Sequence, residues 1–128
     1  MKTIKQSYKI KSPIEKVWQA LVNPKLIEEW SGSPAKMDGE VGTNFELWGG
    51  DVHGTNIEAT ENKKLVQDWF GGDWPEASRV TFTLTKENDG TGLDLLNENI
   101  PDEESESIAD GWNRYYLGEI KKYLERPT

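Results

Sequence analysis

Acid–base chemistry in this chain could come from one pair of side chains, Asp51 and His53. His53 is the only histidine in the sequence, and the two side chains share a face if the strand around them is regular. His53 comes directly before Gly54, at a predicted strand end, so a partly exposed histidine without a catalytic role is the simpler interpretation. A buried His53 would favour an enzyme, whereas a solvent-facing His53 would favour a binding protein.

Metal and nucleophile chemistry have little support in the sequence. There is no cysteine, which excludes disulfides, thiolate metal sites and a cysteine nucleophile. A single histidine cannot build a zinc site with three imidazoles, and no Gly-x-Ser-x-Gly elbow accompanies it. We therefore predict no metal site, no cofactor and no dedicated catalytic residue.

The aromatic residues point instead to a binding cavity. Six of the thirteen are tryptophans. Large rings tile a concave sheet less tightly than Leu and Val, so a helix laid across such a sheet tends to leave an apolar cavity. The predicted lining is apolar with one amide at its polar end, and comprises Phe45, Leu47, Trp69, Phe82, Leu93, Leu95, Asn97, Trp112 and Tyr116. The alternative is that these side chains fill the core completely.

Three further tryptophans could instead meet a protein partner. Trp30, Trp48 and Trp74 fall near Gly- and Pro-rich breaks, where full burial is hard. Tryptophan is enriched at the energetic centres of protein interfaces. The competing explanation is that each ring clamps a loop.

The element that would position the cavity residues is the last quarter of the chain, residues 101–126. Its apolar residues recur at a helical period, and the resulting stripe consists of Ile108, Ala109, Trp112, Tyr116, Ile120 and Tyr123. Acidic residues at the start and basic residues at the end match the helix dipole. Gly111 and Gly118 lie away from the stripe, and each costs about 1 kcal/mol against Ala. The sequence reveals no packing reason for either glycine.

The preceding chain predicts two short helices and then a run of strands. A period-two strand over residues 3–11 leads to Ser12-Pro13-Ile14-Glu15, where Ser12 would cap a helix and Glu15 would complete a capping box. Asn23 would cap a second short helix that reaches Trp30. Short strands with alternating apolar residues follow, at about residues 45–47, 52–59, 64–70, 79–85 and 93–97.

The order of these elements defines the expected fold. Consecutive strands joined by short turns, such as Asn88-Asp89-Gly90, predict antiparallel pairing. Each strand has one polar face, so one side of the sheet meets water and the other meets the helices. We therefore predict an α+β fold, with a curved antiparallel sheet of about six to seven strands wrapped around a long C-terminal helix and two short helices after the first strand. At 128 residues the chain is expected to form one domain, over residues 1–128.

Charge limits the partners that the chain could meet. The formal net charge is -8 and the sequence pI is about 4.7, with no basic patch. Nucleic acid and anionic membrane surfaces are therefore not expected partners. The first residues alternate in polarity, so we expect no signal peptide or membrane span and a cytoplasmic protein.

With these elements in place, the chain resembles a known family. The element order is similar to the helix-grip fold of START domains, the birch-pollen allergen and polyketide cyclases. Within it, the chain resembles the activator of the ninety-kilodalton heat-shock chaperone ATPase (AHSA) family, in particular its C-terminal domain. The stretches that carry the resemblance span nearly the whole chain: Ser12 to Leu21, Asn23-Pro24 with Trp30, Val41-Gly42 with Phe45, Lys64 to Trp69, Trp74-Pro75, Thr91 with Leu93 and Leu95, Ile100-Pro101, Gly111 to Tyr116, and Ile120-Lys121.

The resemblance implies binding more than catalysis. It covers one of the two domains of the co-chaperones, and the half that would clasp the chaperone has no counterpart in this sequence. Two hypotheses follow, because fold alone does not decide function. The first is a non-catalytic protein, monomeric or homodimeric, that holds a small apolar ligand or meets a chaperone-like partner. The alternative is a small enzyme of the polyketide cyclase or hydrolase sort, with an apolar substrate or water placed by Asp51, His53 or Tyr116.

Overall fold

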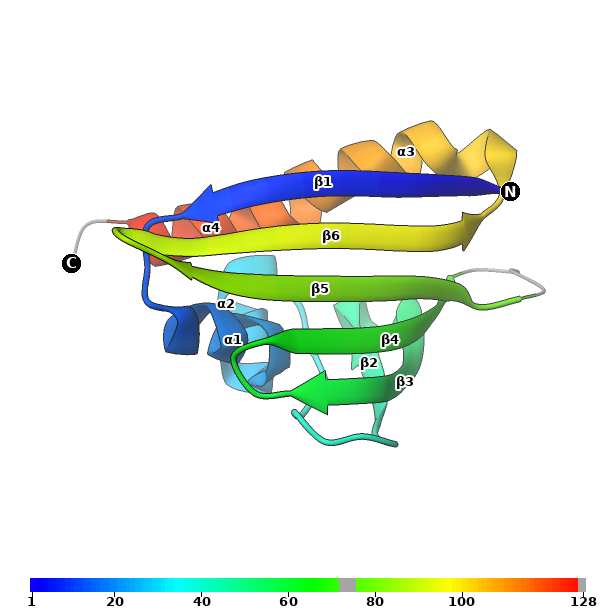
Figure 1. Ribbon diagram of the computed structural model, residues 1–128. Coiled ribbons are helices and arrows are strands. Elements are labelled where there is room, and N and C mark those ends of the chain that lie inside the picture. The colour runs from blue at the N-terminus through cyan, green and yellow to red at the C-terminus, as the bar shows by residue number, and fades with distance from the viewer. Residues whose placement is uncertain (72–75, 127–128) are drawn as a thin grey trace.

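The computed structural model describes residues 1–71 and 76–126, and its sheet contains six strands over those residues. Every neighbouring pair is antiparallel, in the order β1-β6-β5-β4-β3-β2. The first strand therefore lies beside the last (Figure 1). The strands are β1 (Lys2–Ile10), β2 (Asn44–Leu47), β3 (Val52–Thr60), β4 (Lys64–Gly71), β5 (Ser78–Glu87) and β6 (Gly90–Ile100).

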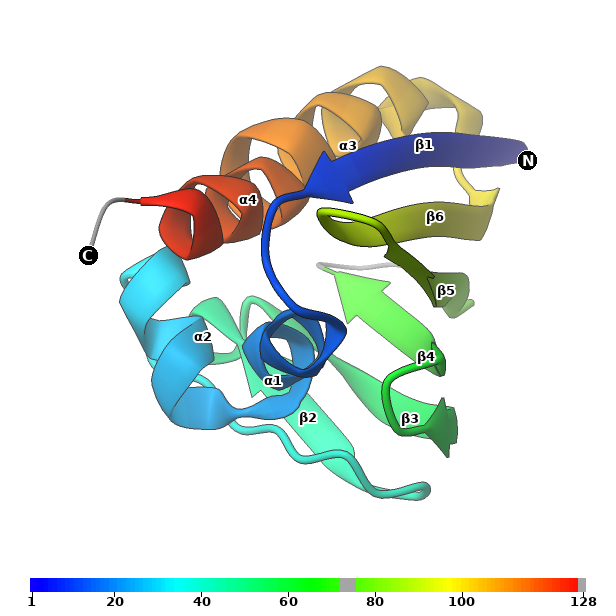
Figure 2. The same ribbon diagram turned by 60° about the vertical axis from the view of Figure 1, so that its left-hand side comes forward.

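The helices cover one face of this sheet. Helices α1 (Ile14–Val22) and α2 (Pro24–Ser31) follow β1, and the C-terminal helical run consists of a 3-10 turn (Asp102–Glu104), α3 (Ser105–Gly111), a π-helical segment (Trp112–Tyr116) and α4 (Leu117–Glu125). The end of this run packs against β1, α1 and α2, while α1 also packs on β5 and β6. Figure 2 shows the sheet curving around the helices. The predicted α+β helix-grip architecture is confirmed.

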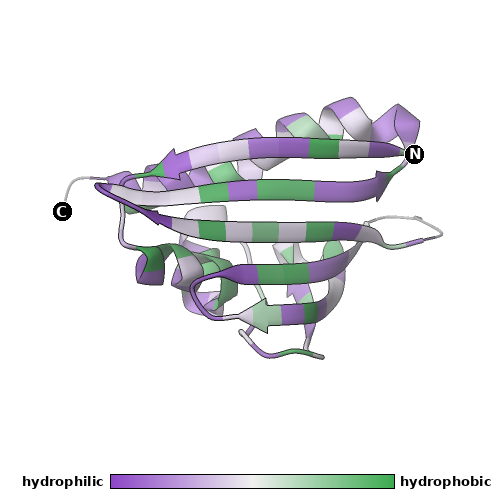
Figure 3. Ribbon diagram, viewed as in Figure 1, coloured by the Kyte–Doolittle hydropathy of each residue, from purple (hydrophilic) through white to green (hydrophobic). Residues whose placement is uncertain are grey.

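Side-chain alternation explains why the sheet has a dry and a wet face. Val80, Phe82 and Leu84 of β5 are buried, whereas Arg79, just before them, and Thr83, between Phe82 and Leu84, are exposed. Figure 3 shows apolar and polar residues alternating along the strands. The predicted hairpin turn is also confirmed, because Glu87 pairs directly with Gly90.

The two N-terminal helices begin in different ways. The Asn23 side chain accepts a hydrogen bond from the Lys25 amide at 3.0 Å, so the predicted cap of α2 is confirmed. The predicted cap of α1 is wrong, since Pro13 occupies the N-cap and no side chain caps the helix. Ser12 lies one residue too early and is buried; its carbonyl accepts a hydrogen bond from the Thr91 hydroxyl at 2.9 Å.

The C-terminal element is not the uniform α-helix that its periodicity predicts. Residues 112–116 widen into a π-helical turn, which brings the Asn113 carbonyl against the backbone of Gly118. A Cβ at Gly118 would lie 1.8 Å from that oxygen, so only glycine fits there. Gly118 is thus explained by a close backbone approach that an α-helical pitch does not contain. No helix among the described residues combines the length and apolar character that a membrane crossing requires.

Candidate functional site

An apolar cavity of about 420 Å³ lies between the sheet and the C-terminal helical run. In the part of the chain that the structure describes, its wall is almost entirely carbon and includes no charged side chain. The described lining residues are Trp48, Val52, Trp69, Gly71, Ser78, Asn97, Ile108, Gly111, Trp112, Tyr115 and Tyr116. Three other hollows of about 380 to 390 Å³ exist, but charged side chains line each of them. The aromatic lining, not the volume, marks this cavity as a candidate ligand site.

Tyr116 is the centre of the aromatic cluster at the cavity. Its ring centroid lies 4.8 Å from Trp30, 4.9 Å from Trp112 and 5.6 Å from Trp69. The rings are tilted by 48 to 57°, an arrangement that aromatic pairs prefer over face-to-face stacking. These rings therefore pack against one another along the inner wall.

Trp48 reaches the wall through an unusual backbone conformation. Its φ is 51°, in the left-handed region that costs a non-glycine residue roughly 1 to 2 kcal/mol. Gly49 and Gly50 follow with φ of 68° and 100°, and with Trp48 they form a tight 3-10 turn. The turn brings the Trp48 ring to 6.0 Å from Tyr116.

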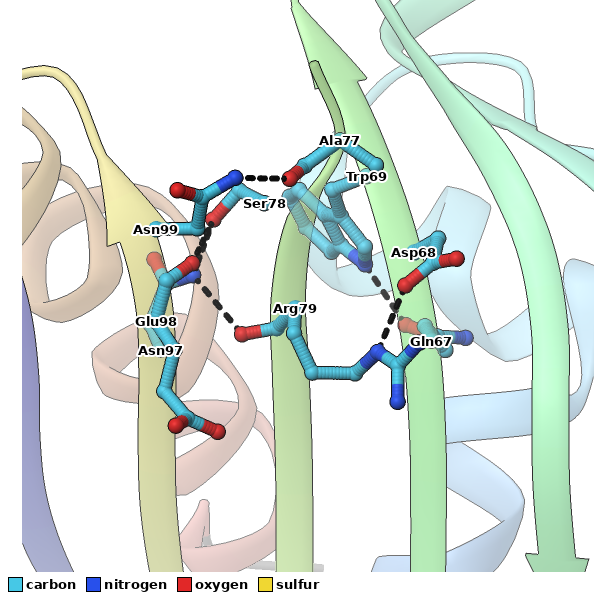
Figure 4. A network of polar contacts seen from close by, with 9 residues as sticks. All are labelled: Gln67, Asp68, Trp69, Ala77, Ser78, Arg79, Asn97, Glu98 and Asn99. Carbon is cyan, nitrogen blue, oxygen red and sulfur yellow. Dashed lines mark hydrogen bonds and ion pairs between the residues drawn. The ribbon is translucent and has the colours of Figure 1, made fainter. Parts of the chain in front are cut away.

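A chain of buried polar groups anchors Trp112 to the sheet. The indole Nε1 of Trp112 donates to Asn97 Oδ1 at 2.9 Å. Asn97 Nδ2 in turn donates to Ser78 Oγ at 2.5 Å, and Ser78 Oγ donates to the Glu98 carbonyl at 2.9 Å. Figure 4 shows how β5 and β6 supply these groups. All three side chains are already paired with protein groups.

A second chain anchors Trp69 in the same way. Its Nε1 donates to Gln67 Oε1 at 2.7 Å (Figure 4). Gln67 Nε2 donates to Asn56 Oδ1 at 2.9 Å, and Asn56 Nδ2 donates to the Asp38 carbonyl at 2.9 Å. Both tryptophan indoles are therefore fixed by buried amides, which is the pattern expected when buried polar groups must be satisfied.

The Tyr116 hydroxyl differs from these groups. Within residues 1–71 and 76–126 it is the one buried side-chain polar atom without a hydrogen-bond partner. An unpaired buried polar group costs about 1 to 3 kcal/mol. Burial also raises the pKa of Tyr116 far above its ordinary value, so the hydroxyl stays protonated and can donate a hydrogen bond.

The π-helical segment brings its own residues to the cavity. Trp112 and Tyr116 begin and end it, and Tyr115, which is 60% exposed, lies at the edge of the lining. Just before the segment, Gly111 has space beside it: of the described residues, a Cβ there would meet only Tyr115, at 3.9 Å. Gly111 thus leaves room at the cavity that any larger residue would reduce.

The structure brings four of the nine predicted lining residues together. Trp69, Asn97, Trp112 and Tyr116 lie in the wall. The other five lie instead in the packed core, because α1 packs on β5 and β6 and other core side chains pack against these residues; they are Phe45, Leu47, Phe82, Leu93 and Leu95, each at most 2% exposed. Their expected place at the cavity is corrected, and the alternative of a filled core holds for this end of the sheet.

The three tryptophans expected at a partner surface have different positions. Trp30 is 5% exposed and its Nε1 donates to the Ala20 carbonyl at 2.9 Å, so its expected exposure is wrong. The physical reason is that α2, which carries Trp30, packs on α1 and α4, and the ring lies against Tyr116. Trp48 is half-buried at the cavity. Trp74 lies outside the described residues.

Asp51 and His53 do not contribute to the cavity. Both are exposed, and the His53 ring stacks on Phe70 with centroids 5.7 Å apart and planes 14° apart. A solvent-facing His53 is the outcome that favours a binding protein over an enzyme. Of the three groups considered for catalysis, only Tyr116 lines the cavity.

Sequence reasoning missed seven of the described lining residues. Trp48 was expected at a partner surface instead, and two of the other six carried a usable signal. Ser78 continues the buried alternation of Val80 and Phe82, and Ile108 belongs to the aromatic stripe of the last helix. The positions of the other four depend on turns and on the π-helical segment, which periodicity does not encode; they are Val52, Gly71, Gly111 and Tyr115.

A curved antiparallel sheet around a C-terminal helix, with an apolar cavity between them, defines the helix-grip class of START-like proteins. Within this class the chain belongs to the AHSA family: the family model described as activator of Hsp90 ATPase homolog 1-like protein matches residues 11–125. The resemblance inferred from the sequence is confirmed.

Relatives and solved structures agree with this assignment. The activator of 90 kDa heat shock protein ATPase homolog 1 of Homo sapiens is 30% identical over 122 residues, covering 94% of this chain and 36% of the relative. An Hsp90 activator from Plasmodium falciparum has a TM-score of 0.89 at 28% identity, covering 98% of this chain and 97% of that one. A protein from Mesorhizobium loti has a TM-score of 0.84 at 28% identity, covering 99% of both chains. The chain spans about a third of the length of the curated relatives that it matches.

Proposed function

We propose that the chain is a non-catalytic binding protein of the AHSA type that holds a small apolar ligand between its sheet and its C-terminal helical run. The observation that carries this proposal is the cavity of about 420 Å³, whose wall is aromatic and uncharged over the residues that the structure describes. Its volume lies within the range of about 300 to 1,000 Å³ that is typical of ligand sites. The exposed position of Asp51 and His53 supports binding over the cyclase or hydrolase alternative.

Native mass spectrometry of the purified protein, with a thermal-shift screen of apolar compounds, tests this function. A co-purifying small molecule, or an increase in Tm of several degrees, is expected because a ligand that binds only the folded state stabilises it by mass action. No bound mass and no shift across a broad apolar library would contradict the proposal.

Gly111 offers a way to attribute any shift to this cavity. Gly111→Leu places a side chain at the cavity and should reduce the ligand-induced shift at least by half, and Gly111→Ala should reduce it less. Ser107→Leu adds the same side chain at an exposed position of the same helix and should leave the shift unchanged. Equal shifts in Gly111→Leu and Ser107→Leu would place the ligand elsewhere.

A chaperone partner is the second candidate function, and the family assignment favours it. The human relative is named an activator of the 90 kDa heat shock protein ATPase, so a cytoplasmic co-chaperone-like role is proposed for this chain as well. Isothermal titration against purified Hsp90 should show binding with a Kd in the micromolar range or tighter. If no binding heat is detected at concentrations high enough to reveal a Kd 100-fold weaker than micromolar, the co-chaperone-like role is excluded. Light scattering of the same samples would distinguish a monomer from a homodimer.

A further inference from the structure

The polar groups at the cavity narrow the chemistry of its ligand. Apart from Tyr116, the buried side chains of the described wall that carry polar atoms are occupied by hydrogen bonds within the protein: Asn97, Ser78, Trp69 and Trp112. Trp48 is only half-buried and Tyr115 is 60% exposed, so their N–H and hydroxyl groups are not enclosed in the same way. The Tyr116 hydroxyl, on a ring that forms part of the wall, has no partner among the described residues. A ligand atom that accepts a hydrogen bond from this hydroxyl would satisfy the one buried side-chain polar group that the described fold leaves unpaired.

The lack of charge in the described wall further restricts the ligand to uncharged groups. Among residues 1–71 and 76–126, no Lys, Arg, His, Asp or Glu side chain lines the cavity, so a carboxylate or an ammonium group against this part of the wall would be buried without a counter-ion, at a high cost. Because burial keeps the phenol protonated, Tyr116 acts as a neutral donor. The matching ligand group is therefore an uncharged acceptor.

The shape of the wall favours rings over flexible chains. Trp48, Trp69, Trp112 and Tyr116 present rigid rings to the same space. Flat ring systems can pack on such rings with favourable offset or edge-to-face geometry. A flexible acyl chain would also lose more rotamer freedom on binding.

We propose that the cavity takes a neutral, ring-shaped apolar molecule with a carbonyl oxygen that accepts a hydrogen bond from the Tyr116 hydroxyl. This inference rests on the ligand-binding function proposed above. The hydroxyl oxygen is itself shielded by neighbouring atoms, so the ligand reaches it through a side-chain adjustment of the kind that is common on binding.

Three matched probes test the ligand chemistry: fluorenone, fluorene and fluorene-9-carboxylate, titrated into the full chain with tryptophan fluorescence as the readout. The ketone should bind about fivefold more tightly than the hydrocarbon, as expected for one net hydrogen bond. The carboxylate should bind at least tenfold more weakly than the ketone. Tyr116→Phe should lower ketone affinity to that of the hydrocarbon, while Tyr123→Phe, whose hydroxyl contacts Glu29 at the surface, should retain the preference.

The outcomes separate this inference from the proposed function. Equal binding of fluorenone and fluorene to the unmodified protein, tightest binding of the carboxylate, or a ketone preference that survives Tyr116→Phe would each overturn the inference while leaving a ligand-binding protein. Binding of none of the three probes would overturn the inference, and a blank apolar library would overturn the proposed function as well. If Tyr116→Phe does not fold, the ratio of ketone to hydrocarbon affinity in the unmodified protein still decides whether the cavity prefers a ligand with a hydrogen-bond acceptor.

Discussion

Asn97 is the residue through which β6 holds the Trp112 side of the cavity. It accepts from Trp112 and donates to Ser78, so its removal leaves the Trp112 indole N–H buried without a partner. We expect Asn97→Ala to lower the free energy of unfolding by about 2 to 3 kcal/mol, measured by urea titration. Glu98→Ala, at the neighbouring exposed position of β6, is the matched control and should change it by less than about 0.5 kcal/mol. Equal losses would contradict the role of the buried amide.

Tyr116 makes the stability of the folded chain depend on pH in the alkaline range. Its pKa is raised by burial, from an ordinary value of 10.0, so below pH 10 the phenol is neutral in both the folded and the unfolded chain. As the pH rises above 10, only the unfolded chain releases this proton, and stability falls. Between pH 9 and pH 11, the free energy of unfolding, measured by urea titration, should therefore fall by about 1 kcal/mol less in Tyr116→Phe than in the unmodified protein. The same alkaline loss in both proteins would refute this assignment.

The π-helical segment is the element that distinguishes this site from a uniform helix laid on a sheet. Gly118 allows the segment, because a Cβ there would collide with the Asn113 carbonyl, whereas Gly111 has free space. We expect Gly118→Ala to destabilise the protein by about 2 kcal/mol or more, and Gly111→Ala to stabilise it by up to about 1 kcal/mol. Urea unfolding of both variants compares the same chemical change within one helical run. A stable Gly118→Ala variant would mean that the segment can return to α-helical geometry at little cost.

At the scale of the whole molecule, the chain end is tied back to the junction between β1 and α1. Glu125 accepts from the Lys121 ammonium group and from the Lys11 amide, both at 2.8 Å. The Lys121 hydrogen bond, followed by that from Lys11, lowers the pKa of Glu125 below its ordinary 4.5. Its contribution to stability is therefore present above pH 4.5 and is lost as the pH falls through the lowered pKa.

Substitution of Glu125 tests this connection. Glu125→Gln should lower the free energy of unfolding by less than about 1 kcal/mol at pH 7, because the pair is partly exposed, and this loss should be smaller at pH 3, since protonation of Glu125 removes the charge. Chemical unfolding at both pH values measures the difference, with Glu61→Gln in an exposed turn as the control. An equal loss at pH 3 would show that the carboxylate charge is not what holds the chain end.

Local patterns decided much of this fold. Alternation along β5, the Asn23 cap and the hairpin at Asn88-Asp89-Gly90 each depend on neighbouring residues, and the structure contains all three. The family resemblance was also readable, because it depends on the order and spacing of short motifs along nearly the whole chain.

Tertiary packing decided which aromatic side chains form the site. Periodicity placed Trp112 and Tyr116 on the inner stripe, but it could not show that residues 112–116 widen into a π-helical turn, since that geometry depends on the close approach of Gly118 to Asn113. Nor could it separate Phe82 and Leu95, which α1 and the core enclose, from Trp69, which remains at the cavity wall. The sequence by itself determined the fold class, the stripe and the turns, because short-range periods and turn chemistry encode them. Only the tertiary structure decided where the helices meet the sheet and where they leave it open, because the gap between two packed elements depends on contacts among residues that are distant in the chain.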